Sequence, residues 1–154
     1  MNIELRRLEP HDLDTVEEIE RASYPTPWSR AMFVAELRKP RSLALGAYSE
    51  EAGLVGYAFV SRYVDAWHVM NVAVAADHRR RGIATTLLER LFEVTASDPR
   101  SGYTLEVRVS NEHAIRLYEC LGFEARGTRR GYYTDNHEDA LIMWREPASP
   151  EEAS

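Results

Sequence analysis

The six residues Arg79-Arg80-Arg81-Gly82-Ile83-Ala84 decide the predicted fold of this chain. They follow the apolar segment 69–74, which is typical of a buried strand. They precede a run whose apolar positions fall on one helical face: Ala84, Leu87, Leu88 and Leu91. The sequence around Gly82 therefore predicts a strand, a tight turn and the start of a helix.

A turn of this kind predicts an anion site. Several backbone N–H groups at a helix start point toward one spot, and the positive end of the helix dipole lies behind them. Gly82 has no Cβ to block a close approach, and the three arginines add full positive charge. These features favour a pyrophosphate ligand. A basic loop with a helix-starting glycine is the alternative interpretation of the same residues.

Length and composition are typical of a soluble globular protein. A length of 154 residues fits one domain, and a hydrophobic fraction of 44% argues against disorder. We therefore expect one domain over residues 1–146, followed by a flexible acidic tail over residues 147–154. No apolar run approaches the roughly 20 residues that cross a bilayer, so no membrane partner is expected. The net charge of -6 argues against a nucleic-acid partner. The single cysteine, Cys120, excludes an internal disulfide and favours a cytoplasmic location. Without a self-association stripe, we expect a monomer or weak dimer.

Hydrophobic periodicity predicts elements in the order β-α-α-β-β-β-α-β-α-β-β, which favours an α/β layered domain with a mixed sheet. The expected strands lie at 3–6, 43–49, 54–64, up to 74, 103–109, 123–128 and 140–144. The expected helices lie at 12–22, from Ser29 to before Pro40, from the arginine turn to about residue 96, and from Ser110 or Asn111 to Gly122.

The same periodicity predicts which side chains share a face of a helix or strand. In the second helix we expect Met32, Phe33 and Leu37 inside. On the strand 103–109, Leu105, Val107 and Val109 should share one face, with Glu106 and Arg108 on the other. The five histidines have no metal-ligand spacing, so no metal is expected: His11, His68, His78, His113 and His137.

These motifs together resemble the Gcn5-related N-acetyltransferase (GNAT) superfamily. Its signature, Gln/Arg-x-x-Gly-x-Gly/Ala after a strand, matches residues 79–84. More closely, the chain resembles the bacterial ribosomal-protein-alanine N-acetyltransferases of the RimI type. The matching segments are 24–29, 71–74, 105–111, 117–123 and 130–133. The resemblance implies a mixed, mostly antiparallel central sheet flanked by helices.

The resemblance also implies acetyl-coenzyme A as the co-substrate. Three residues should lend backbone groups to its acetyl and pantetheine parts: Val72, Ala73 and Val74. The pyrophosphate should lie against the turn: Arg79, Arg80, Arg81, Gly82, Ile83, Ala84 and Thr85. Asn111 should contact the cofactor as well. Ala84 replaces the second glycine of many members, which leaves slightly less room beside the phosphate.

By the same resemblance, Glu106 matches the general base and Tyr118 the general acid. A neutral amine attacks the thioester, so a carboxylate must take a proton from the ammonium form, and a phenol can protonate the departing thiolate. Tyr118 is expected on the first turns of the helix that follows the Glu106 strand. The alternatives are a solvated carboxylate paired with an arginine for Glu106, and a core aromatic with a hydrogen-bonded hydroxyl for Tyr118.

Aromatic and proline residues in two loops are candidates for acceptor binding: Tyr24, Pro25, Trp28, Tyr132 and Tyr133. They would form a narrow channel for an extended chain end, although Trp28 and one tyrosine would alternatively close the core. The implied reaction is acetylation of a protein N-terminus, with the N-terminal alanine of a small-subunit ribosomal protein as the expected acceptor. A lysine side chain, an amino acid or a small amine is an alternative acceptor, and a non-catalytic acyl-coenzyme A sensor is an alternative function.

Overall fold

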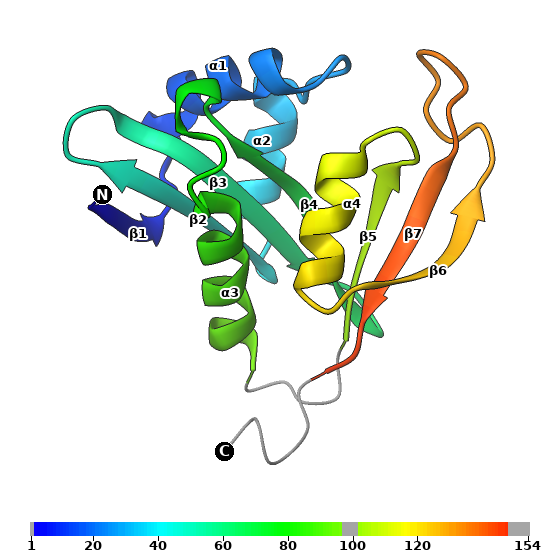
Figure 1. Cartoon of the computed structure of the whole chain (residues 1–154). Coiled ribbons are helices and arrows are strands. Elements are labelled where there is room, and N and C mark those ends of the chain that lie inside the picture. Colours follow the sequence, from blue (N-terminus) through cyan, green and yellow to red (C-terminus); the bar gives the residue numbers. More distant parts are fainter. Residues whose placement is uncertain (1, 97–101, 148–154) are drawn as a thin grey trace. The chain divides into compact units, whose positions relative to one another are not determined.

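The order of helices and strands predicted from the sequence is confirmed by the structure, a computed structural model that describes residues 2–96 and 102–147 (Figure 1). The strands are β1 (Ile3–Arg7), β2 (Ser42–Ser49), β3 (Gly53–Arg62), β4 (Ala66–Val74), β5 (Gly102–Arg108), β6 (Glu124–Arg129) and β7 (Ala140–Arg145). The helices are α1 (Leu13–Ser23), α2 (Arg30–Arg38), α3 (Ile83–Thr95) and α4 (Glu112–Cys120), with short 3-10 turns η1 (Pro10–Asp12) and η2 (Ala76–His78). Most of the expected acidic tail, residues 148–154, lies outside the described residues.

The strands follow the order β1-β2-β3-β4-β5-β7-β6 within the described residues. Neighbours pair antiparallel from β1 to β3 and from β5 through β7 to β6. β4 and β5 instead pair in parallel, from Ala66 opposite Gly102 to His68 opposite Thr104. The mixed, mostly antiparallel sheet expected from the resemblance is thus confirmed. No helix in residues 2–96 or 102–147 is long and apolar enough to cross a membrane.

The chain divides into two compact units, which are described separately. The first contains the chain up to Arg62 together with Val69–Val94. Its β3 is buried on both faces, which explains why residues 54–60 are apolar almost without interruption. Tyr57 and Phe59 pack in one cluster with α1 and α2, whereas Gly56 lies against Ile83 at the start of α3.

The expectation that Met32 lies inside was wrong. Met32 of α2 is 48% exposed. The buried side of this nine-residue helix contains Phe33 and Glu36, and Met32 lies outside it. Val109, expected as the last residue of a strand, follows β5, which ends at Arg108, and is 44% exposed. Ser29 does cap α2, as expected, by accepting a hydrogen bond from the Met32 N–H.

The second unit contains Tyr63–His68 and the chain from Thr95 onward. Leu105 and Val107 of β5 are buried, and Leu105 lies opposite the buried Met143 of β7. Glu106 has the opposite orientation along the strand and pairs with Ile142. α4 begins at Glu112 and is followed by Gly122, whose φ of +94° ends the helix as predicted. The carboxyl end of β5 and the β6–β7 connection therefore lie in one unit.

Candidate active site

The arginine turn has the backbone that its sequence predicted. Gly82 has a φ of +77°, and α3 begins at the next residue, Ile83, which is buried. A Cβ placed on Gly82 would meet no described atom within 4 Å. The turn is thus open beside Gly82, and this open space fits a bulky ligand at the helix start. Arg80 also adopts a left-handed conformation, with a φ of +64°.

The first turn of α3 is suited to an anion. The Thr86 N–H and hydroxyl both bond to the Gly82 carbonyl, at 3.0 and 2.9 Å. The N–H groups of the residues between them are the ones that an α-helix leaves without intrahelical partners. No acidic residue lies in this first turn, so its partial positive charge is not offset there by a side chain.

Arg79 holds the turn through two hydrogen bonds, although the residue is exposed. Its Nε donates to the Val74 carbonyl at 3.1 Å, and its Nη2 donates to the Ser23 hydroxyl at 3.2 Å. Both partners lie in the first unit, at the ends of β4 and α1. The guanidinium therefore fixes the start of the turn, while the side chain of Arg80 is exposed.

The predicted cofactor strand is the end of β4. Val72 and Ala73 are buried, and Val74 is partly buried. The Val72 carbonyl accepts a hydrogen bond from the hydroxyl of Tyr24. A side chain on Gly56 would lie only 3.2 Å from the Ala73 carbonyl, so the neighbouring strand must stay small here.

Glu20 of α1 forms a buried network that sequence reasoning missed. Its side chain accepts hydrogen bonds from the Tyr57 hydroxyl at 2.5 Å, the Asn71 amide at 2.9 Å and the Trp28 N–H at 2.9 Å. Burial raises the pKa of Tyr57 well above its ordinary value, and the bond to Glu20 raises it further, so the phenol stays a donor. The available signal was an acidic residue directly after Ile19 on the apolar face of α1.

The loop between α1 and α2 contains the three acceptor candidates of the first unit. Trp28 packs on Phe33 and Phe59, with ring centroids 5.2 and 5.9 Å apart. Tyr24 is also partly buried against the core, whereas Pro25 is exposed. The core contacts of Trp28 and Tyr24 match the alternative interpretation left open by the sequence, and they hold the loop in a defined place.

In the second unit, Glu106 is surrounded by polar groups. Its side chain is 25% exposed, and its Oε1 lies 3.6 Å from Arg129 Nε. The Tyr132 hydroxyl interacts with the same carboxylate, and burial followed by the charge of Glu106 raises the pKa of Tyr132. Burial lowers the pKa of His68, against the opposing charge of Glu106. The carboxylate thus has the arginine partner of the alternative interpretation, and also adjoins a phenol and an imidazole.

Tyr118 lies in the last turn of α4, not on the first turns as expected, because the helix has only nine residues. Its ring packs edge-on against Phe123, with centroids 5.7 Å apart, and the residue is 9% exposed. Burial, with a smaller contribution from Tyr133, raises the pKa of Tyr118 to about 12. Within the described part of the chain, no hydrogen bond reaches its hydroxyl, unlike the bonded core tyrosine of the alternative interpretation.

Arg108 organises the loop that contains Tyr132 and Tyr133. Its Nη2 forms two bonds to Asp135, at 3.0 and 2.9 Å, and its Nη1 lies 3.4 Å from Glu138. The guanidinium lies over the Tyr133 ring, 4.0 Å from its centroid. Alternation along β5 predicts that Arg108 shares a face with Glu106. Its partners Asp135 and Glu138 could not be predicted, because they lie 27 and 30 residues away in the sequence.

Asn111, a predicted cofactor contact, has a structural bond in this unit. Its side-chain oxygen accepts from the Ala114 N–H at 3.3 Å and so caps α4. The prediction that Ser110 or Asn111 is the cap is therefore resolved in favour of Asn111. The Ser110 N–H instead donates to Glu138 at 2.7 Å.

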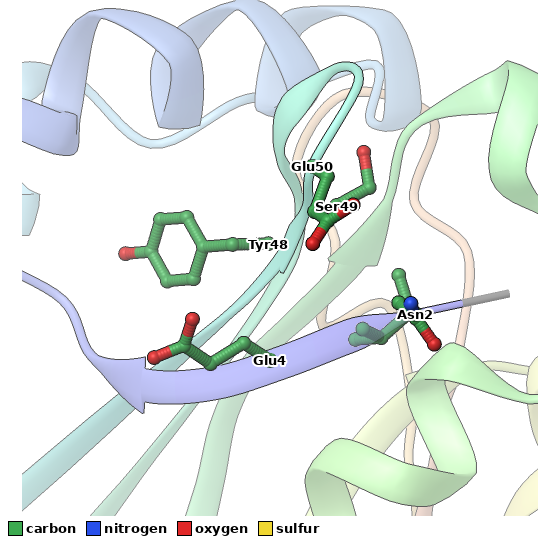
Figure 2. Close-up of a pocket in the computed structure, with 6 residues that line it drawn as sticks. Asn2, Glu4, Tyr48, Ser49 and Glu50 are labelled. Atoms are coloured by element: carbon green, nitrogen blue, oxygen red, sulfur yellow. The ribbon is translucent and has the colours of Figure 1, made fainter.

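A hollow at the paired ends of β1 and β2 contains none of the predicted site residues (Figure 2). It is lined by Asn2, Ile3, Glu4, Tyr48, Ser49 and Glu50. The Tyr48 hydroxyl already donates to Asp12 at 2.9 Å. No group of three or more potential metal ligands was found among residues 2–96 and 102–147.

A sequence model of the acetyltransferase (GNAT) family matches residues 13–123. The chain is 36% identical over 138 residues to the ribosomal protein bS18-alanine N-acetyltransferase of Escherichia coli (strain K12), covering 88% of this chain and 92% of that one. It is 36% identical over 154 residues to an N-alpha-acetyltransferase of Saccharolobus solfataricus, covering 92% and 91%. The crystal structure of the ribosomal-protein-S18-alanine N-acetyltransferase from Escherichia coli has a TM-score of 0.85 to this chain at 33% identity, covering 97% of each. The chain belongs to the acetyltransferase (GNAT) family, and the resemblance found in its sequence is confirmed.

Proposed function

We propose that this acetyltransferase moves the acetyl group of acetyl-coenzyme A to the N-terminal amine of a protein, with the N-terminal alanine of ribosomal protein bS18 as its acceptor. The observation that carries the proposal is the 36% identity to the Escherichia coli enzyme of that name, which extends over 88% of the chain. The archaeal relative named as an N-alpha-acetyltransferase supports the same acceptor class.

The residues of the first unit fit the co-substrate. The open turn at Gly82 and the unneutralised first turn of α3 suit a pyrophosphate, with Arg80 and Arg81 supplying charge. Arg79, tied to Val74, acts by holding the turn. We assign the remaining contacts in this unit to the backbone of Ile83, Ala84 and Thr85 for the pyrophosphate, and to the backbone of Val72, Ala73 and Val74 for the acetyl and pantetheine parts. Asn111, a residue of the second unit, is assigned to the cofactor from the family resemblance alone.

Glu106 and Tyr118 supply the proton transfers in this proposal. A peptide α-amine has a pKa of roughly 7.7–8, so much of it is an ammonium group at neutral pH. Glu106 takes one proton from the ammonium group, the neutral amine attacks the thioester carbonyl, and the carbon–nitrogen bond forms as the carbon–sulfur bond breaks. Tyr118, whose pKa of about 12 keeps it protonated, gives its proton to the departing thiolate. The nitrogen loses its second proton as it becomes an amide, and that proton restores the Tyr118 phenol through solvent.

The acceptor side consists of the aromatic loops. The candidates in the first unit are Tyr24, Pro25 and Trp28, and the candidates in the second unit are Tyr132 and Tyr133. Core packing holds the Trp28 ring, and Arg108 holds the Tyr133 ring. Because both rings are already fixed, binding an acceptor costs them little conformational entropy. Tyr132 is 46% exposed and remains accessible to an incoming chain end.

Purified protein and acetyl-coenzyme A test the proposal with four acceptors. They are a peptide copying the N-terminus of bS18 from the same genome, that peptide with its α-amine blocked and one internal lysine added, free alanine, and spermidine. Mass spectrometry should find one acetyl group on the α-amine of the first peptide only. Acetylation of lysine, alanine or spermidine without the α-amine would contradict the acceptor class. Acetyl-coenzyme A binding without turnover on any amine would support a sensor instead.

A further inference from the structure

Residues Tyr24-Pro25-Thr26-Pro27-Trp28, here called the strap, are fastened directly to β4 at one end and through Glu20 of α1 at the other. At one end, the Tyr24 hydroxyl donates to the Val72 carbonyl. At the other end, the Trp28 N–H donates to Glu20 Oε2 at 2.9 Å, and Oε1 of the same carboxylate accepts from the Asn71 side chain at 2.9 Å. Asn71 and Val72 are consecutive residues of β4, so both fastenings reach one point of the strand.

Glu20 is an unusual residue for this place because it is 1% exposed. Among the described residues it forms no ion pair, and its charge is balanced by three hydrogen-bond donors instead. Buried polar groups are costly unless they are bonded, and bonds to an ionised acceptor are roughly twice as strong as neutral ones. The network is therefore a strong and specific connection between α1, β3, β4 and the strap.

The chemistry of the donors explains why a carboxylate is required. The Trp28 N–H is a backbone donor that cannot reorient, and the Tyr57 phenol and the Asn71 amide occupy the other oxygen. A carboxylate, with an acceptor on each oxygen, satisfies all three donors as they stand. A glutamine at position 20 has one NH₂ group. Facing Trp28, this group sets two donors against each other and pushes the strap away; facing the other side, it requires the Tyr57 hydroxyl and the Asn71 amide to turn and accept from it.

We propose that Glu20 is a positioning residue for the acceptor: it holds the strap against β4, so that the acceptor-binding loop is formed before the acceptor arrives. This inference rests on the proposed function, because that proposal makes the strap part of the acceptor side. A strap that must be ordered during binding weakens the acceptor complex, since immobilising loops and side chains costs free energy.

Glu36→Gln is a matched control for Glu20→Gln. Glu36 is also a buried carboxylate of the first unit, 4% exposed, and it accepts from Lys39 at 2.8 Å and from Ser42 at 3.0 Å. These bonds join α2 to β2 and involve no strap residue. Both substitutions remove a bonded buried charge, so both should lower the melting temperature.

The two variants should differ in acceptor binding. We expect Glu20→Gln to raise the KM for the bS18 peptide on the order of 10-fold, with the affinity for acetyl-coenzyme A within about 2-fold of the unmodified protein. Glu36→Gln should leave both values unchanged. Amide hydrogen exchange, followed by NMR, should accelerate at Trp28 in Glu20→Gln and remain slow there in Glu36→Gln.

Each outcome decides the matter. Faster exchange at Trp28 without a change in peptide KM would make Glu20 merely structural, and unchanged exchange at Trp28 in folded Glu20→Leu, which has no side-chain acceptor, would refute the fastening itself. Should Glu20→Gln fail to fold, Tyr24→Phe opens the other end of the strap and should raise the peptide KM similarly; an unchanged KM would overturn the proposal. If the unmodified protein acetylates no α-amine, the proposed function fails, and the exchange data still test the fastening.

Discussion

Gly53 and Gly82 have nearly the same backbone conformation, with φ of +72° and +77°, and a Cβ on either would meet no described atom within 4 Å. Gly53 lies at the start of β3 and Gly82 lies before α3. An alanine at either position costs about 1–2 kcal/mol because L-residues avoid this conformation. We predict that Gly53→Ala and Gly82→Ala lower the free energy of unfolding by similar amounts in chemical denaturation.

Only Gly82→Ala should also weaken acetyl-coenzyme A binding, because its new methyl group would occupy the open space beside the helix start. Isothermal titration calorimetry of both variants measures this difference. Equal affinities in the two variants would show that the cofactor does not approach Gly82, and the assigned pyrophosphate site would be wrong.

Glu106→Gln separates a catalytic carboxylate from a structural one. If Glu106 is the base, kcat should fall by roughly 10²- to 10⁴-fold while acetyl-coenzyme A affinity stays close to that of the unmodified protein. Stability should change little, since the ion pair with Arg129 at 3.6 Å is partly exposed and such pairs contribute about 0–1 kcal/mol. Glu124→Gln, an exposed carboxylate of β6, is the control. A variant with normal kcat would assign Glu106 to structure alone.

Tyr118→Phe should lower kcat by about 10²-fold or more without unfolding the protein, because the ring keeps its packing on Phe123. Since its pKa is raised to about 12, the Tyr118 hydroxyl is protonated from pH 6 to pH 9. The ratio of the two kcat values should therefore be constant over that range. A ratio that changes tenfold across it would mean that Tyr118 ionises during the titration and does not act as the acid described here.

His68 should make the protein less stable in mild acid. Burial lowers the pKa of the folded side chain below its ordinary value of 6.5, so the unfolded chain binds this proton more readily. The stability contributed by neutral His68 is fully present above about pH 6.5 and is lost as the pH falls below it. The groups that act on it are Glu106, Asp65 and Arg129, with the Tyr63 ring 4.6 Å away.

His68→Gln tests this directly. The difference in melting temperature between pH 7.5 and pH 5.5 should be smaller in the variant, because the substitution removes only the His68 imidazole. An equal difference would mean that His68 has the same pKa in the folded and unfolded chains.

The order of elements was predictable because local patterns determine it. Apolar periodicity located each helix, Ser29 marked the start of α2, and the glycine at 122 marked the end of α4. The turn at residues 79–82 was predictable for the same reason, since its backbone depends on its own residues. Which side of a helix faces solvent depends on the elements that pack against it, and not on the helix sequence alone. For this reason the exposure of Met32 was not predicted.

The polar contacts of the candidate site could not be predicted, because they join distant residues. Glu20 bonds to residues 37 and 51 positions away, and Arg108 bonds to Asp135 across 27. Contacts between residues so far apart in the sequence produce no periodic pattern from which they could be predicted. The roles given to Glu106 and Tyr118 came from the family resemblance and await the variants described above.

The way the strap is attached separates two tasks within five residues. Its first and last members bond to the protein body, whereas Pro25, Thr26 and Pro27 between them are exposed. Randomising the middle three positions should diversify substrate choice in a library while most clones still fold. Randomising position 24 or 28 should mainly produce variants that fold poorly.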